Sequence, residues 1–226
     1  MTRVAPYLLI GLLAFSGNAL AAVVSYRFDS IFSGTAPAGA SPWLTATFTD
    51  TAGGVQVDVS AAGLSGNENL KGLYFNLVSS LNPSQLQFSF LGGTQAASVS
   101  LGANGYKADG NGFYDIRLNY GSGSSGLGPG GASSYRISGI SSLAAGSFIA
   151  FSSPGGGNGT HYAAAHVQSI GAGGESGWVH PSAYSTQVAA VPLPAALPLI
   201  LAGLGGLGLF SRARRPKRNK PQVCNS

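Results

Sequence analysis

The sequence predicts an all-β domain of the β-sandwich or jelly-roll type, flanked by an N-terminal signal peptide and a single C-terminal transmembrane helix. Glycine accounts for 35 of the 226 residues and charged residues for only 8%, which is typical of a chain rich in turns. Short stretches alternate apolar and polar residues, as half-buried strands do. Each end carries an apolar run beside basic residues. These observations leave residues 22–190 as one β-rich extracytoplasmic domain.

The N-terminal residues 1–21 have the order of a secretory signal peptide. Arg3 precedes the apolar run 4–15, and the small residues Ala19 and Ala21 follow it. We expect the Sec translocon to export the chain and signal peptidase to cut after Ala21. A membrane anchor is the alternative, but the run is shorter than the roughly 20 residues that a membrane-spanning helix needs.

The middle of the chain is predicted to consist of about nine short strands. Residues 44–49 and 55–60 alternate strictly, and the turn-forming residues 50–54 between them predict a hairpin. Further strands are expected at 23–28, 73–78, 86–90, 114–120, 135–138, 148–151 and 164–170. No segment of this domain has convincing helical periodicity. Many short strands separated by turns favour a sandwich or a jelly roll.

The C-terminal part has three segments in a fixed order. A proline motif, Val191-Pro192-Leu193-Pro194-Ala195, is followed by the apolar stretch 195–210, which is the expected transmembrane helix. A basic stop at 212–220 comes next, with Arg212, Arg214, Arg215, Lys217, Arg218 and Lys220. Basic residues directly after a span hold that end in the cytoplasm, so we expect the β domain to lie outside the membrane.

Residues 191–220 resemble the PEP-CTERM sorting signal, in the variant that begins Val-Pro-Leu-Pro-Ala. The resemblance implies that an exosortase, a membrane-embedded transpeptidase, recognises the proline motif and cuts near it. It also implies delivery to the cell surface or to the extracellular polysaccharide of a Gram-negative bacterium. Leu193 stands where many members of the family carry Glu. A permanent C-terminal membrane anchor is the alternative, and a short tail, 221–226, follows the signal.

The basic character of the chain comes from its ends. The formal net charge is +5 and the isoelectric point is about 9.5, but residues 22–190 contain all seven acidic residues and only five of the basic ones. We therefore exclude a nucleic-acid partner. The only cysteine, Cys224, lies in the tail, so the domain has no disulfide framework.

Few residues of the domain suggest a chemical site, and we expect no cofactor, no metal and no catalysis. The strongest candidate is calcium binding by Asp109, Asn111 and Asp115 in a glycine-rich stretch. A hairpin turn that favours Asp and Asn is the alternative. His161 and His166 are five residues apart, which places them on opposite faces of a strand and disfavours a shared metal.

The sequence therefore predicts a non-catalytic, exported surface or matrix protein that associates with exopolysaccharide. A carbohydrate-binding module is the alternative, because aromatic side chains can stack on sugars. Its candidate residues are Trp43, Trp178, Tyr74, Tyr114 and Tyr120, for which core packing is the simpler interpretation. A secreted hydrolase whose carboxylates meet only in the fold is the least favoured hypothesis.

Overall fold

The computed structural model describes residues 20–157 and 159–190, and over these residues the chain is all-β as predicted. Three short 3₁₀ helices accompany the strands: η1 (Pro83–Gln85), η2 (Gly123–Ser125) and η3 (Ala145–Phe148). The strands are β1 (Leu20–Gly34), β2 (Leu44–Thr51), β3 (Gly54–Ser60), β4 (Asn69–Phe75), β5 (Gln87–Gly93), β6 (Ser98–Lys107), β7 (Phe113–Asn119), β8 (Ala132–Ser138), β9 (Ala163–Ile170) and β10 (Glu175–Ala190).

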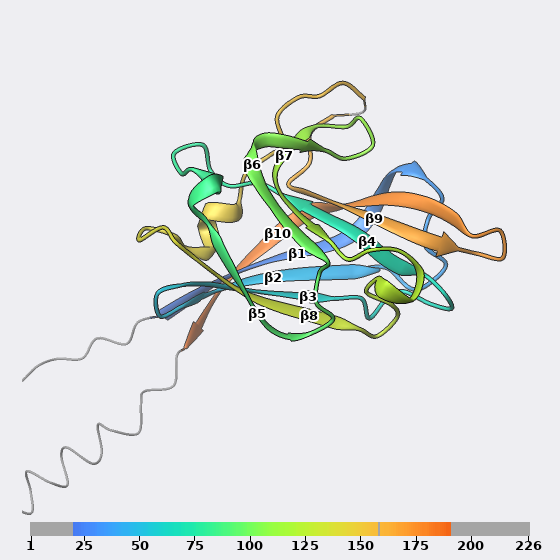
Figure 1. The fold of residues 1–226 in the computed structure, drawn as a ribbon, viewed down its shortest axis with the longest axis horizontal. Coiled ribbons are helices and arrows are strands. Elements are labelled where there is room, and N and C mark those ends of the chain that lie inside the picture. The colour runs from blue at the N-terminus through green and yellow to red at the C-terminus, as the bar shows by residue number, and fades with distance from the viewer. Residues whose placement is uncertain (1–19, 158, 191–226) are drawn as a thin grey trace, which may run out of the picture. The chain divides into compact units, whose positions relative to one another are not determined.

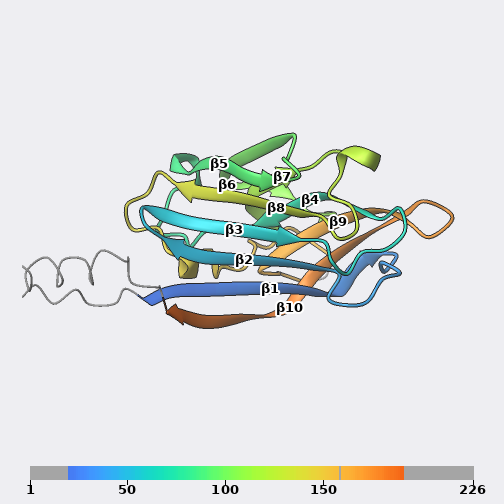
Figure 2. The ribbon, with the colours of Figure 1, turned by 90° about the horizontal axis from the view of Figure 1, so that it is seen from below.

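The strands form one continuous sheet instead of the two sheets of a sandwich. Its order is β5-β8-β3-β2-β1-β10-β9-β4-β7-β6. The edge strands β5 and β6 are consecutive in the chain, and only residues 94–97 separate them. Because four residues span little more than about 14 Å when extended, the two edges must lie near each other. The sheet therefore curls into a nearly closed barrel, which is visible in Figure 2.

Strands β1 and β10 join the two halves of this sheet. The amide of Thr35, just after β1, donates to the carbonyl of Ser176, and Asp29 accepts two hydrogen bonds of 2.9 Å from Ser182. Residue numbers rise along β1 while they fall along β10, so the two strands are antiparallel. A side chain at Gly177 would overlap the carbonyl oxygen of Thr35, so glycine permits this close approach.

The predicted hairpin is confirmed, whereas the strand predicted at 148–151 is wrong. Strands β2 and β3 pair from Thr45 opposite Ser60 to Thr51 opposite Gly54, and their side chains alternate between buried and half-buried. Residues 148–151 instead contain the end of η3 and irregular chain. Strands β6 and β10 lacked a clear alternation in the sequence because polar and small residues occupy much of both.

The inner face of the curled sheet holds one large apolar core, whose centre is aromatic. The ring of Phe48 stacks on that of Phe148 at 4.5 Å and meets the edges of Phe75 and Tyr26 at 5.2 and 5.9 Å between centroids. A smaller cluster lies apart from this core and contains Tyr74, Ala108, Tyr114 and Ala164. Strand β4 contributes to both clusters, which explains why almost all of its residues are buried.

The expected sorting segments fall mostly outside the described residues. These are the signal peptide up to position 19 and the whole of 191–226, including the proline motif, the apolar stretch and the basic stop. Leu20 and Ala21 already belong to β1, so the expected cleavage would remove the first two residues of that strand. Among the described residues, no helix is long and apolar enough to span a membrane.

A candidate ligand-binding groove

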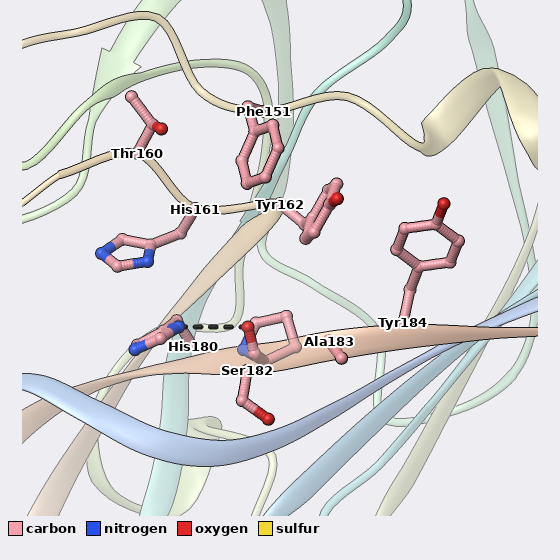
Figure 3. A pocket seen from close by; sticks show the side chains of 9 residues that line it. Phe151, Thr160, His161, Tyr162, His180, Ser182, Ala183 and Tyr184 are labelled. Atoms are coloured by element: carbon pink, nitrogen blue, oxygen red, sulfur yellow. Dashed lines mark hydrogen bonds between the residues drawn. The ribbon is translucent and has the colours of Figure 1, made fainter.

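A groove of about 420 Å³ lies between the second half of β10 and the segment that leads into β9. Figure 3 shows its side chains converging from these two segments, which β9 and the first half of β10 separate in the sequence. One wall consists of Phe151 and residues 160–162, and the other of residues 180–184. The groove is therefore a product of the tertiary fold.

The groove exists because β10 parts from β9. The two strands pair from Glu175 opposite Ile170 to Val179 opposite Ala165, and the pairing ends there. Pro181 follows two residues later in β10, and proline has no amide proton to donate to a neighbouring strand. The second half of β10 consequently has a free edge, which faces the groove wall.

Three aromatic rings form the apolar part of the groove. Phe151 stacks on Tyr162 at 4.0 Å between centroids with an interplanar angle of 23°, and Tyr184 meets Tyr162 edge-on at 5.0 Å. Phe151 is 57% exposed and Tyr184 is 39% exposed. Aromatic rings of this size are normally buried, so an exposed group of them marks a surface that can bind a ligand.

A buried residue of the domain positions the aromatic rings of the groove. Tyr162 lies parallel to the buried Tyr26, with 6.1 Å between ring centroids. The Tyr26 hydroxyl donates a hydrogen bond of 2.7 Å to the carbonyl of Phe148 in η3. Because Tyr26 is completely buried and fixed by this bond, it restricts the position of Tyr162. The groove is thus largely pre-formed, as small-molecule sites usually are.

Two histidines lie side by side at the other end of the groove. The ring centroids of His161 and His180 are 3.9 Å apart, and Nδ1 of His180 donates to the carbonyl of Pro181 at 3.1 Å. Burial, together with the positive charge that His180 can carry, lowers the pKa of His161 to about 4. His161 is therefore uncharged at neutral pH. No Asp, Glu, Lys or Arg is found among the described residues that line the groove.

The three calcium-candidate residues have different neighbours in the structure. The Asp115 carboxylate accepts amide hydrogens from Leu77 at 3.0 Å and from Asn104 at 2.8 Å. Asn111 is buried beside His161, with 3.4 Å between Nδ2 and Nε2 of the two side chains. Asp109 lies in the turn between β6 and β7, whose pairing confirms the hairpin interpretation of this stretch. Within the ranges that the structure describes, no three His, Cys, Asp or Glu residues are placed to hold a metal.

Most aromatic residues named from the sequence lie in the interior. Trp43, Tyr74, Tyr114 and Tyr120 are buried, and Trp43 donates its indole hydrogen to the carbonyl of Gly39. Trp178 is half-buried and stacks on His166 at 4.4 Å with an interplanar angle of 1°. The ring of Phe32 lies 5.0 Å from that of His161 and 6.2 Å from that of Trp178 between centroids, so one aromatic residue links the two pairs.

The sequence interpretation missed Phe151, Tyr162 and Tyr184 as surface residues. Phe151 ends the apolar run 148–151, which the sequence predicts as a strand, whereas Tyr162 and Tyr184 stand among small or polar neighbours. No local pattern therefore distinguishes the three residues from core residues. Pro181 was the one available signal, since proline within a strand indicates a free edge. Of the predicted sorting residues, Ala21 lies buried in β1, whereas Ala19, residues 191–195 and the basic stop lie outside the described part of the chain.

Comparison of the chain with known protein families, with curated proteins and with solved structures finds no match.

Proposed function

We propose that this protein is a non-catalytic surface or matrix protein that is exported by the Sec translocon and sorted by an exosortase-like transpeptidase. The order of proline motif, apolar stretch and basic stop in residues 191–220 carries the proposal. The described domain fits this arrangement. Because β1 and β10 are antiparallel neighbours, the start of β1 and the end of β10 come at the same end of the domain (Figure 1).

The processing step is tested by mass spectrometry of the protein recovered from the cell surface. Processing predicts a mature chain that starts at Ala22 and lacks residues 212–226. Replacing Pro192 and Pro194 by Ala should leave the full C-terminus in the inner-membrane fraction. Recovery of an intact Arg212–Ser226 segment on wild-type surface protein would support a permanent anchor instead.

Carbohydrate binding is a second candidate function, and the aromatic groove favours it. The apolar faces of sugar rings pack on flat aromatic side chains, and Phe151 and Tyr184 expose such faces. The described residues of the lining include no Asp, Glu, Lys or Arg, which favours a neutral ligand over an acidic or strongly basic one. The hydroxyls of Thr160, Ser182 and Tyr184 supply polar groups along the same groove.

Affinity retardation on neutral polysaccharides tests this second function with the full chain. Dextran, cellulose and mannan columns serve as probes, and Phe151→Ala and Tyr184→Ala should each reduce retention. Phe90→Ala is the matched control, because Phe90 is a 38% exposed aromatic residue on β5, outside the groove. Equal retention of the wild-type protein and the three variants would contradict carbohydrate binding in the groove. Trp43 is unsuitable for such a test, because it is part of the core.

A further inference from the structure

A second pocket, of about 380 Å³, lies beside the groove and shares Phe151 with it. Its remaining wall comes from the segment after β4, from β6, from β7 and from Ala150 and Ser153 beside Phe151. Whereas the groove is mainly aromatic, this pocket contains several polar side chains: Asn76, Ser79, Asn104, Asp115 and Ser153. Among the described residues, no Lys, Arg or His lines it, and Asp115 is its one acidic residue.

The Asp115 carboxylate supplies hydrogen-bond acceptors. Its Oδ2 accepts the amide of Leu77 and its Oδ1 accepts the amide of Asn104. These bonds fix the carboxylate in one orientation. An ionised carboxylate can accept about four hydrogen bonds, so each oxygen retains capacity for one further donor. The hydroxyl groups of a ligand are donors that suit it.

Asn76 supplies an unpaired donor. Its Oδ1 accepts the amide of Asp115 at 3.1 Å, which fixes the orientation of the side-chain amide and leaves Nδ2 as a donor. Asn76 is 2% exposed, and Nδ2 has no hydrogen-bond partner in the part of the chain that the structure describes. A buried, unpaired donor costs about 1–3 kcal/mol, and a ligand oxygen in the pocket would remove this cost.

The two polar groups and the shared aromatic ring together match one chemical class. The fixed acceptors of Asp115 and the donor of Asn76 can both form hydrogen bonds with hydroxyl groups, and the exposed Phe151 ring packs on an apolar ring face. An anion is disfavoured by Asp115. A metal ion is disfavoured because the two bonded oxygens of Asp115 already face amide hydrogens and no second acidic side chain of the described residues lines the pocket.

We propose that this pocket binds one pyranose unit of a neutral glycan, with Asp115 and Asn76 on its hydroxyls and Phe151 against its ring. The proposal rests on the carbohydrate-binding function proposed above and adds the subsite that selects the sugar. The aromatic groove on the other side of Phe151 then receives the adjoining part of the glycan chain.

The subsite is tested with the full chain on columns of immobilised D-glucose, D-galactose, D-mannose and N-acetyl-D-glucosamine. The wild-type protein should be retained on at least one of them and eluted by the same free sugar. Ala103→Trp fills the pocket from an exposed position, without changing Asn76 or Asp115. It should abolish retention. Ala172→Trp, at an exposed turn position between β9 and β10, is the matched control and should be retained.

Asn76→Asp tests the donor, since it keeps an acceptor for the Asp115 amide and removes Nδ2. It should weaken binding of the retained sugar about tenfold. Thermal unfolding shows whether the Asn76→Asp variant is folded. If the variant does not fold, an NMR experiment on the wild-type protein takes its place: the ¹⁵N–¹H signal of the Asn76 side chain should shift when that sugar is added.

The outcomes separate this proposal from the carbohydrate-binding function on which it rests. Equal retention of wild type and Ala103→Trp, or an Asn76 signal that does not shift, overturns the subsite and leaves the aromatic groove as the binding surface. Failure of the wild-type protein to bind any of the polysaccharides or monosaccharides overturns both.

Discussion

The backbone nitrogen of Ala22 lies 3.2 Å from Oδ2 of Asp50, across the pair of strands β1 and β2. The other oxygen, Oδ1, accepts the amide of Ala145 at 2.6 Å, at the start of η3. One carboxylate thus connects the beginning of β1 with η3. Ala22 is also the residue that would become the N-terminus if the signal peptide is removed after Ala21.

Signal-peptide removal is expected to strengthen the contact between Ala22 and Asp50. In the precursor the nitrogen is a neutral amide, but in the mature chain it would be an ammonium group paired with a carboxylate. Asp50→Asn should therefore cost about 1 kcal/mol more stability in a chain that starts at Ala22 than in one that starts at Met1. Urea unfolding of the four proteins at pH 7 measures this difference. An equal cost in both chains would show that the ammonium group does not use Asp50.

Two phenylalanines should respond very differently to replacement by Ala. Phe48 is completely buried between Phe75 and Phe148, so Phe48→Ala should lower the free energy of unfolding by about 3–5 kcal/mol. Phe151 is 57% exposed, and its replacement should change this free energy by no more than about 0.5 kcal/mol. Urea unfolding checks both. A large loss for Phe151→Ala would mean that its ring supports the fold.

Stability should fall as the pH decreases from about 6.5 to about 4. His161 has a pKa near 4 in the folded protein and an ordinary value of 6.5 when unfolded, so between these values the unfolded chain binds more protons. The contribution of uncharged His161 to the free energy of unfolding is complete above pH 6.5 and is lost as the pH falls to 4. Urea unfolding at several pH values gives the slope of the free energy of unfolding against pH. This slope should be smaller for His161→Gln than for the wild-type protein.

His166→Gln serves as a comparison in the same experiment. Burial, with a contribution from Lys71, also lowers the pKa of His166. His166→Gln should therefore also reduce the slope of the free energy of unfolding against pH, independently of the effect of His161→Gln. A NMR titration gives the pKa of His161 directly. A midpoint at 6.5 or above would contradict the burial of its ring beside His180.

Calcium should have no effect on thermal unfolding. A ligand that binds only the folded state raises stability by RT ln(1 + [L]/Kd), so a site with a Kd of about 10⁻⁵ M would add roughly 2.7 kcal/mol at about 1 mM calcium. The Asp115 carboxylate is oriented by the amides of Leu77 and Asn104, which disfavours a joint site with Asp109 and Asn111. Calorimetry with calcium and with a chelator measures the unfolding temperature in both conditions. A clearly higher unfolding temperature with calcium would support the calcium hypothesis.

Sequence patterns predicted the strands whose two faces differ. In β2 and β3 every second side chain enters the core, so the alternation is visible in the sequence and the hairpin follows from it. Strand β4 was found only in part, because it contributes to two apolar clusters and therefore lacks alternation. Strand β10 was missed because most of its second half is exposed around Pro181.

The sequence by itself determined the β-rich class of the domain, and the signals expected at its two ends stay a prediction. These properties depend on residues that are close together in the chain. Only the tertiary structure decided that the strands form one curled sheet, because the pairing of β1 with β10 joins segments about 150 residues apart. The course of β10 beside the segment that leads into β9 brings Tyr184 to Tyr162, and the β4–β7 contact brings Asn76 to Asp115. Such sites arise from long-range contacts, which local periodicity does not encode.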